Sequence, residues 1–373
     1  MIRNLFVLIA LVLNGSFLPA DDHGAQVKPL MHVFLMELEK LSPYLNSEKG
    51  LESEKAKEQI SSSLSILERK VRNAPPSIKE NPGFRISFSL LSDHIVKTKA
   101  VFEKGEYDYA RMRLNGTTAL CAACHLQTPK VSTFSPFSGL EERIRAVNFN
   151  NASFLFVIRR YPEALAMYDE LARKYPESKV TSDELKDLYR RKLSIFARVT
   201  KDPRQALENF KTDLKNKNLP LDVRQNIKEW SVGLEAWSKE PSDPAKLSTP
   251  ELVSFVEKNL PGPLSRNIAP GDPRLLTILR LSGLLYERLY SAPAGPNTQA
   301  LLYYLALSER NLSPVYFYSV GDVYLKECVV HYPKKTFSKR CFEAYRDGMT
   351  ERFFGRTIPE PIQQSIEAMR DYL

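Results

Sequence analysis

The chain of 373 residues contains only four cysteines and five histidines, and its basic residues form no long block. It has no phosphate-binding glycine loop, no His-Glu-x-x-His metalloprotease helix and no Gly-x-Ser-x-Gly nucleophile elbow. Beyond the N-terminal segment, no stretch approaches the ~20 apolar residues of a membrane-spanning helix. These absences exclude the usual signatures of nucleotide hydrolysis, zinc proteolysis and serine hydrolysis, and they predict no integral membrane span in the mature chain.

The composition favours a folded protein with a mildly basic surface. Hydrophobic residues make up 43% of the chain, enough at this length to bury two or more cores. The formal net charge is +9, but lysine and arginine alternate with acidic residues along most of the predicted helices. We therefore expect no nucleic-acid partner.

Residues 1–20 have the pattern of a secretory signal peptide. A basic residue precedes an apolar run at residues 5–13, and a cleavage site lies near Ala20. No cysteine follows that site to carry a lipid anchor, so the mature chain is expected to begin near Asp21. An uncleaved anchor over residues 5–18 is the alternative.

The most specific motif is Cys-Ala-Ala-Cys-His at residues 121–125, the spacing of a c-type haem attachment site. If residues 105–126 are helical, Cys121, Cys124 and His125 lie at i, i+3 and i+4 and share one face. Two thioether bonds could then hold the edge of the porphyrin while His125 binds the iron.

Three other kinds of site share part of this motif. A thioredoxin-like dithiol should follow a β-strand, and no strand pattern precedes Cys121. A zinc site needs a second closely spaced ligand pair, and Cys328 and Cys341 are too far apart to supply one. A local disulfide, or a chance occurrence of the pentapeptide in a purely structural repeat protein, remains the third alternative. We predict one covalent haem c, and because bacteria attach such haem outside the cytoplasm, we also predict a periplasmic protein.

Apolar residues recur at helical spacing upstream of the motif. The predicted helices cover residues 27–45, 51–72, 82–103 and 105–126. Four helices joined by short loops favour an antiparallel bundle, so we expect a four-helix-bundle haem domain at residues 21–129.

This domain resembles the class II c-type cytochromes, the cytochrome c′ family, in which the haem motif lies on the last helix of a four-helix bundle. The resemblance rests on motif position and helix count. It implies that Cys121 and Cys124 form the thioethers, that His125 is the proximal iron ligand, and that the first helix covers the other face of the haem. A departure is that Leu126 leads into a linker, where the family usually has a charged end.

The first predicted helix offers Met31, His32 and Met36 on that distal side. Met31 lies in the apolar stripe, and a thioether would suit a low-spin, electron-transferring iron, so the resemblance makes Met31 the candidate sixth ligand. Spacing alone favours both methionines as core residues. His32, like His94 on the third helix, should point away from the main stripe, and the family also includes five-coordinate members with no sixth ligand.

After a predicted linker at residues 130–140, the pattern at residues 141–373 resembles tetratricopeptide repeats. The first repeat, residues 151–178, matches well through Ala152, Leu155, Tyr161, Ala164, Tyr168, Leu171 and Pro176. Weaker matches include Ala206 with Phe210, Gly283 with Tyr286, Ala300 and Tyr304, and Gly321 with Tyr324, Cys341 and Ala344. The resemblance implies an all-α solenoid that docks a partner protein. Two proline-rich stretches, residues 240–250 and 261–273, either form loops on one face or divide the array into two blocks.

Cys328 and Cys341 are equidistant from a predicted turn at residues 332–335, so they should face each other across a helical hairpin. In an oxidising compartment this favours a disulfide worth about 3 kcal/mol. A catalytic thiol would need an activating partner, and His331 lies on the same helix as Cys328 with no third member in evidence.

These features together predict an all-α protein that is not an enzyme. We expect a periplasmic monohaem c-type cytochrome that transfers electrons or carries haem within a larger assembly, with the repeats docking a redox or assembly partner protein. The alternative is a haem-based gas or redox sensor with an open distal site. A haem peroxidase is disfavoured because no distal acid-base pair can be assigned.

Overall fold

The computed structural model describes residues 22–45, 53–126, 142, 144–240, 243–260, 271–291, 295–312 and 320–373. Within these ranges the chain forms sixteen α-helices, one π-helix and one 3-10 helix, and no strand, which confirms the all-α class. None of the described helices is both long and apolar enough to cross a membrane. The predicted signal peptide and linker lie outside the described residues.

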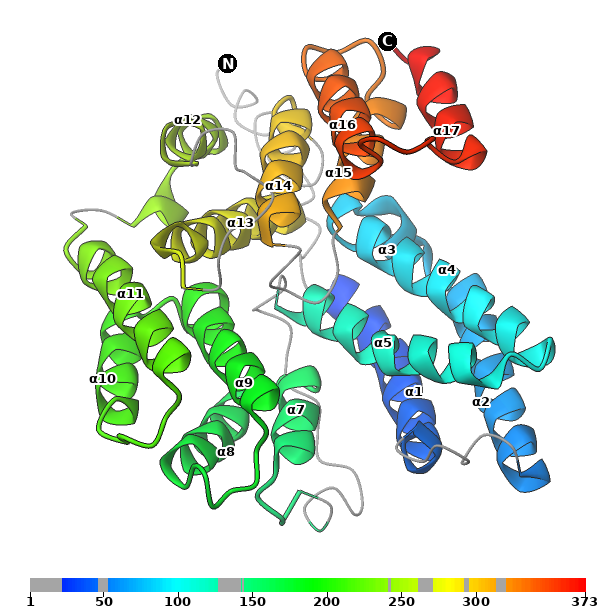
Figure 1. Cartoon of the computed structure of the whole chain (residues 1–373). Helices are drawn as coiled ribbons and strands as arrows, with labels where there is room; N and C mark the ends of the chain where they lie inside the picture. The colour runs from blue at the N-terminus through cyan, green and yellow to red at the C-terminus, as the bar shows by residue number, and fades with distance from the viewer. Residues whose placement is uncertain are drawn as a thin grey trace, which may run out of the picture.

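The first five helices make up a bundle, on the right of Figure 1. They are α1 (Asp22–Leu45), α2 (Glu54–Arg72), α3 (Pro76–Glu80), α4 (Pro82–Glu103) and α5 (Tyr107–His125). Their apolar faces bury one cluster that includes Phe34, Leu64, Ile95 and Leu114. The four long helices lie where the periodicity predicts them. The short α3 was not predicted: Pro76 occupies its first turn, where a missing N–H costs nothing.

The turn between α4 and α5 sets the direction of the motif-bearing helix. The N–H of Gly105 donates to the carbonyl of Phe102, and that of Glu106 donates to Val101, at 2.9 and 3.3 Å. This pair of bonds is a Schellman motif, and Gly105 has the left-handed φ of +80° that the motif requires. As a result, α5 turns back and packs along α4.

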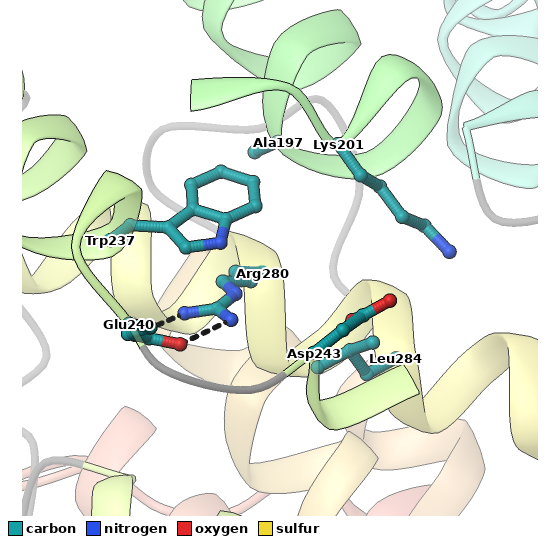
Figure 2. Close-up of a pocket in the computed structure, with 7 residues that line it drawn as sticks. All are labelled: Ala197, Lys201, Trp237, Glu240, Asp243, Arg280 and Leu284. Atoms are coloured by element: carbon teal, nitrogen blue, oxygen red, sulfur yellow. Dashed lines mark hydrogen bonds and ion pairs between the residues drawn. The ribbon is translucent and has the colours of Figure 1, made fainter. Parts of the chain in front are cut away.

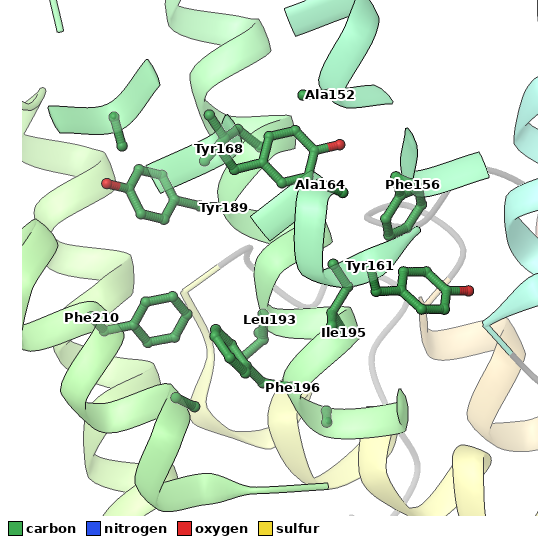
Figure 3. Close-up of a cluster of buried hydrophobic side chains, with 14 of the residues drawn as sticks. Ala152, Phe156, Tyr161, Ala164, Tyr168, Tyr189, Leu193, Ile195, Phe196 and Phe210 are labelled. Carbon is green, nitrogen blue, oxygen red and sulfur yellow. The ribbon is translucent and has the colours of Figure 1, made fainter. Parts of the chain in front are cut away.

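The next helices enclose a second core, to the lower left in Figure 1. They are α7 (Phe149–Val157), α8 (Tyr161–Arg173), α9 (Ser182–Ser194), the π-helix η1 (Ile195–Thr200), α10 (Pro203–Asp213) and α11 (Leu221–Ser238). Ala152 and Ala164 are fully buried between α7 and α8, so these helices can approach closely. Figure 3 shows the aromatic side chains that fill the rest of this core, among them Tyr189, Phe196 and Phe210.

The remaining helices lie across the top of Figure 1 and bury a third core. They are η2 (Pro244–Lys246), α12 (Thr249–Asn259), α13 (Pro273–Ser291), α14 (Thr298–Leu312), α15 (Gly321–Val330), α16 (Ser338–Arg352) and α17 (Glu360–Arg370). Helix α13 joins the cores, because Leu279 belongs to the second and Leu285 to the third. The Sγ atoms of Cys328 on α15 and Cys341 on α16 lie 1.99 Å apart, at disulfide distance.

The bundle packs against both later cores. Leu35, Ala122 and Leu126 belong to the core of α7–α11, although all three precede the predicted linker. At the same end of the bundle, Asn81 at the start of α4 donates from Nδ2 to the carbonyl of Tyr290 in α13 at 3.3 Å. The bundle is therefore in contact with the later helices through α1, α4 and α5.

A buried lysine connects three helices of the second core. Lys192 of α9 has no solvent exposure, and its Nζ lies 2.5 Å from Oδ2 of Asp213 on α10 and 2.7 Å from Oδ1 of Asp169 on α8. The Asp213 side chain is itself buried, so replacing the lysine would leave a buried carboxylate without its cation.

We expect Lys192→Met to lower the free energy of unfolding by about 3–5 kcal/mol, the cost of breaking a buried ion pair on one side. Denaturant titration followed by circular dichroism would measure the change. Lys211→Met is the matched control, because Lys211 pairs with Glu208 at the exposed surface of α10, and it should change stability by no more than about 0.5 kcal/mol. Equal losses in the two variants would contradict the prediction.

Candidate haem-attachment site

The motif residues lie on the last turn of α5. The helix includes Cys121, Cys124 and His125, so the two thiols and the imidazole share one face as predicted. Neither cysteine is in a disulfide, and all three residues are partly buried. The structure thus presents two reduced thiols and one imidazole together, which is the donor set that covalent haem attachment requires.

A hydrogen bond orients the imidazole. Nδ1 of His125 lies 2.5 Å from the carbonyl oxygen of Val157, in the last turn of α7. A carbonyl can only accept, so Nδ1 carries the proton and Nε2 keeps its lone pair. Metal-binding histidines are usually held in this way by an acceptor on the other ring nitrogen. Burial, with a further contribution from the Arg159 guanidinium, lowers the pKa of His125 to about 4, so its imidazole is neutral at physiological pH.

The surroundings do not activate the thiols. Surrounding protein atoms desolvate both side chains, and burial raises the pKa of Cys121 to about 12 and also raises that of Cys124. Redox dithiols have the opposite property, a lowered pKa that makes the thiolate available. The environment therefore argues against disulfide exchange as the chemistry of this motif.

A buried tyrosine hydroxyl lies beside the motif. Tyr161, in the first turn of α8, is 6% exposed, and its hydroxyl makes no hydrogen bond of standard geometry within the described residues; its polar neighbour is the buried Arg159 guanidinium. A hydroxyl and a guanidinium are both hydrogen-bond donors, and the two carboxylates of haem are acceptors. These side chains, with the two thiols and the imidazole, are chemically compatible with haem.

The distal candidates lie on α1, which contacts α5. Leu35 shares a core with Ala122 and Leu126, so this part of α1 packs beside the motif. Met31, one turn earlier, is partly buried against the bundle core. Met31 thus stays a candidate ligand by position. Met36 is also partly buried, and His32 is exposed.

His94 of α4 hydrogen-bonds to helix α5. Its Nε2 donates to the carbonyl of Arg113 at 2.7 Å and lies 3.1 Å from Oγ1 of Thr117, both on α5. It is 7% exposed and serves to hold α4 against α5.

A separate groove lies between the end of α11, the π-helix and α13, with a volume of about 280 Å³ (Figure 2). Arg280 makes two hydrogen bonds to the carboxylate of Glu240, at 2.5 and 2.6 Å, and its guanidinium lies 4.5 Å from the ring centre of Trp237. Lys201 pairs with Glu287. These charged groups already have partners within the fold, and the groove shares no residue with the haem motif.

Comparisons with known proteins found no similar family, protein or structure. Among the residues that the structure describes, no three side chains of His, Cys, Asp or Glu converge as a metal-binding group of their own. The chemistry of the site's own residues is therefore the basis for a function.

Three participants in this site were not predicted from sequence: the carbonyl of Val157, Arg159 and Tyr161. All three lie at the turn between α7 and α8 or at the helix ends that flank it. Sequence periodicity predicts such a turn, but it does not show which element the turn packs against.

Burial lowers the pKa of His94, which predicts a pH-dependent contribution to stability. The unfolded chain protonates His94 near pH 6.5 and the folded chain does so only at lower pH, so its contribution is present above pH 6.5 and is lost as pH falls. Between pH 8 and pH 5, wild type should lose stability relative to His94→Gln, as measured by urea denaturation. A stability difference between wild type and His94→Gln that stays constant from pH 8 to pH 5 would contradict the prediction.

Proposed function

We propose that this chain is an exported, periplasmic, monohaem c-type cytochrome that transfers electrons or carries haem within a larger assembly. In this proposal the first five helices form a bundle of cytochrome c′ type and the remaining helices form a repeat array of tetratricopeptide type. The hydrogen bond between His125 and Val157 carries the proposal, because it selects the tautomer in which Nε2 holds the lone pair that iron binds, on the same helix face as the Cys121 and Cys124 thiols.

The attachment chemistry needs no group beyond those present. Each thiol of Cys121 and Cys124 would add across a vinyl group, with the sulfur bonding to one vinyl carbon and the thiol proton going to the other. No oxidant or leaving group is involved. Haem, when bound, supplies one-electron chemistry between the ferric and ferrous states. His125 would bind the iron, and the carbonyl of Val157 holds the imidazole.

The repeats have two roles in this proposal. The α7–α8 hairpin, whose small contact residues support the tetratricopeptide resemblance, contributes Val157 and Tyr161 to the wall of the haem site. The array as a whole would dock a redox or assembly partner protein. The disulfide-distance pair on α15 and α16 agrees with an oxidising compartment.

Replacing Cys121 and Cys124 together by alanine should abolish covalent haem. The exported wild type should give a pyridine haemochrome spectrum of haem c that survives denaturation and acid-acetone extraction, and the variant should not. Cys328→Ala with Cys341→Ala is the matched control: it removes two cysteines from the same chain and should keep the haem. A wild-type protein with no haem that resists acid-acetone extraction would overturn the proposed function.

Met31→Ala should convert a low-spin spectrum into a high-spin one if the Met31 sulfur binds the iron. Optical and magnetic circular dichroism spectra of the oxidised and reduced protein would show the loss of the methionine-to-iron band. Met36→Ala, a second partly buried methionine of α1, should leave the spectrum unchanged. A wild type that is already high-spin, and that Met31→Ala does not alter, would point instead to a sensor with an open distal site.

A further inference from the structure

The turn between α7 and α8 buries an arginine beside the haem motif. Arg159 is 4% exposed and lies two residues after Val157, whose carbonyl binds His125. Its guanidinium is close enough to Cys124 and His125 to influence the protonation of both. A positive charge is thus held at low dielectric next to the proposed iron ligand.

The backbone at this position is unusual for an arginine. Helix α7 ends in a Schellman motif, in which the N–H of Arg159 donates to Phe156 at 3.2 Å and that of Arg160 donates to Leu155 at 2.9 Å. Arg159 therefore occupies the left-handed position, with φ of 68°, that Gly105 occupies after α4. Glycine is the residue this position favours, because a Cβ is disfavoured there.

Arg159 also differs from the other residues with this conformation. The non-glycine residues with positive φ in the described ranges are Arg159, Lys179, Lys201 and Lys334, and Arg159 is the buried one. Burying a guanidinium costs desolvation energy in addition to the backbone strain. Backbone strain of this kind is concentrated at functional sites, where the strained residue is retained for the role of its side chain.

We propose that Arg159 is a positioning residue that sets the reduction potential of the haem, raising it by placing a fixed positive charge beside the His125 ligand. The inference rests on the proposed haem function. Reduction of ferric to ferrous iron removes one positive charge from the site, and a nearby buried cation favours that change. Because the charge is buried, salt should screen it only weakly.

The test is a spectroelectrochemical titration of the exported full-length protein. Arg159→Gly suits the left-handed backbone and removes the charge, and Arg159→Gln removes the charge with a side chain of similar length. In both variants the equilibrium constant for haem reduction should fall about tenfold. For a one-electron couple this corresponds to a reduction potential about 59 mV lower. The fall should persist at high salt, and Arg159→Lys, which keeps a charge, should recover most of the wild-type value.

Lys179→Gly is the matched control. This variant also replaces a cationic residue of left-handed conformation by glycine, but Lys179 is exposed. The equilibrium constant for haem reduction should therefore stay within about twofold of the wild-type value. An unchanged potential in Arg159→Gly and Arg159→Gln, or an equal fall in Arg159→Lys, would overturn the inference while leaving the haem function intact. A wild type that carries no haem would overturn the proposed function and this inference with it.

Discussion

The hydrogen bond from His125 to the carbonyl of Val157 joins two parts of the chain at the residue on which the proposed function depends. It holds the last turn of α5 against the last turn of α7, and Ala122 and Leu126 bury their side chains in the adjoining core. A bundle without α7 would expose these apolar groups and leave the imidazole without its acceptor. The candidate site is therefore built by the bundle and the α7–α8 hairpin together.

A second contact fixes the same arrangement from the other side. Tyr286 of α13 donates its hydroxyl to the carbonyl of Gly83 at the start of α4, and Arg85 pairs with Glu327 of α15. A Cβ on Gly83 would lie 3.2 Å from the Cα of Tyr290, so glycine allows α4 and α13 this close an approach. The motif helix is thus held between elements that are each packed into a core, which limits how far the turn carrying Arg159 can move from it.

Helical periodicity predicted the long helices of the bundle well, because each buries an apolar stripe, and prolines follow α2 and a glycine follows α4. It missed α3, because a pair of prolines both stops one helix and starts the next. The motif was also predictable, since its three donors lie within five residues. The contacts of Val157, Arg159 and Lys192 were not, because a sequence pattern shows that a residue is charged or polar but not which distant group it meets. Lys192 is the clearest case: its burial depends on carboxylates from two other helices.

The environment of His125 also bears on the kind of haem chemistry that the proposed site would favour. A carboxylate on Nδ1 would raise the basicity of the ligand and stabilise higher oxidation states of iron. Here the acceptor is a neutral backbone carbonyl, and a buried cation lies close by. Both features favour the ferrous state over more oxidised ones. In the proposed site they would support reversible one-electron transfer over peroxide activation, and both groups come from α7 and the turn that follows it, outside the bundle.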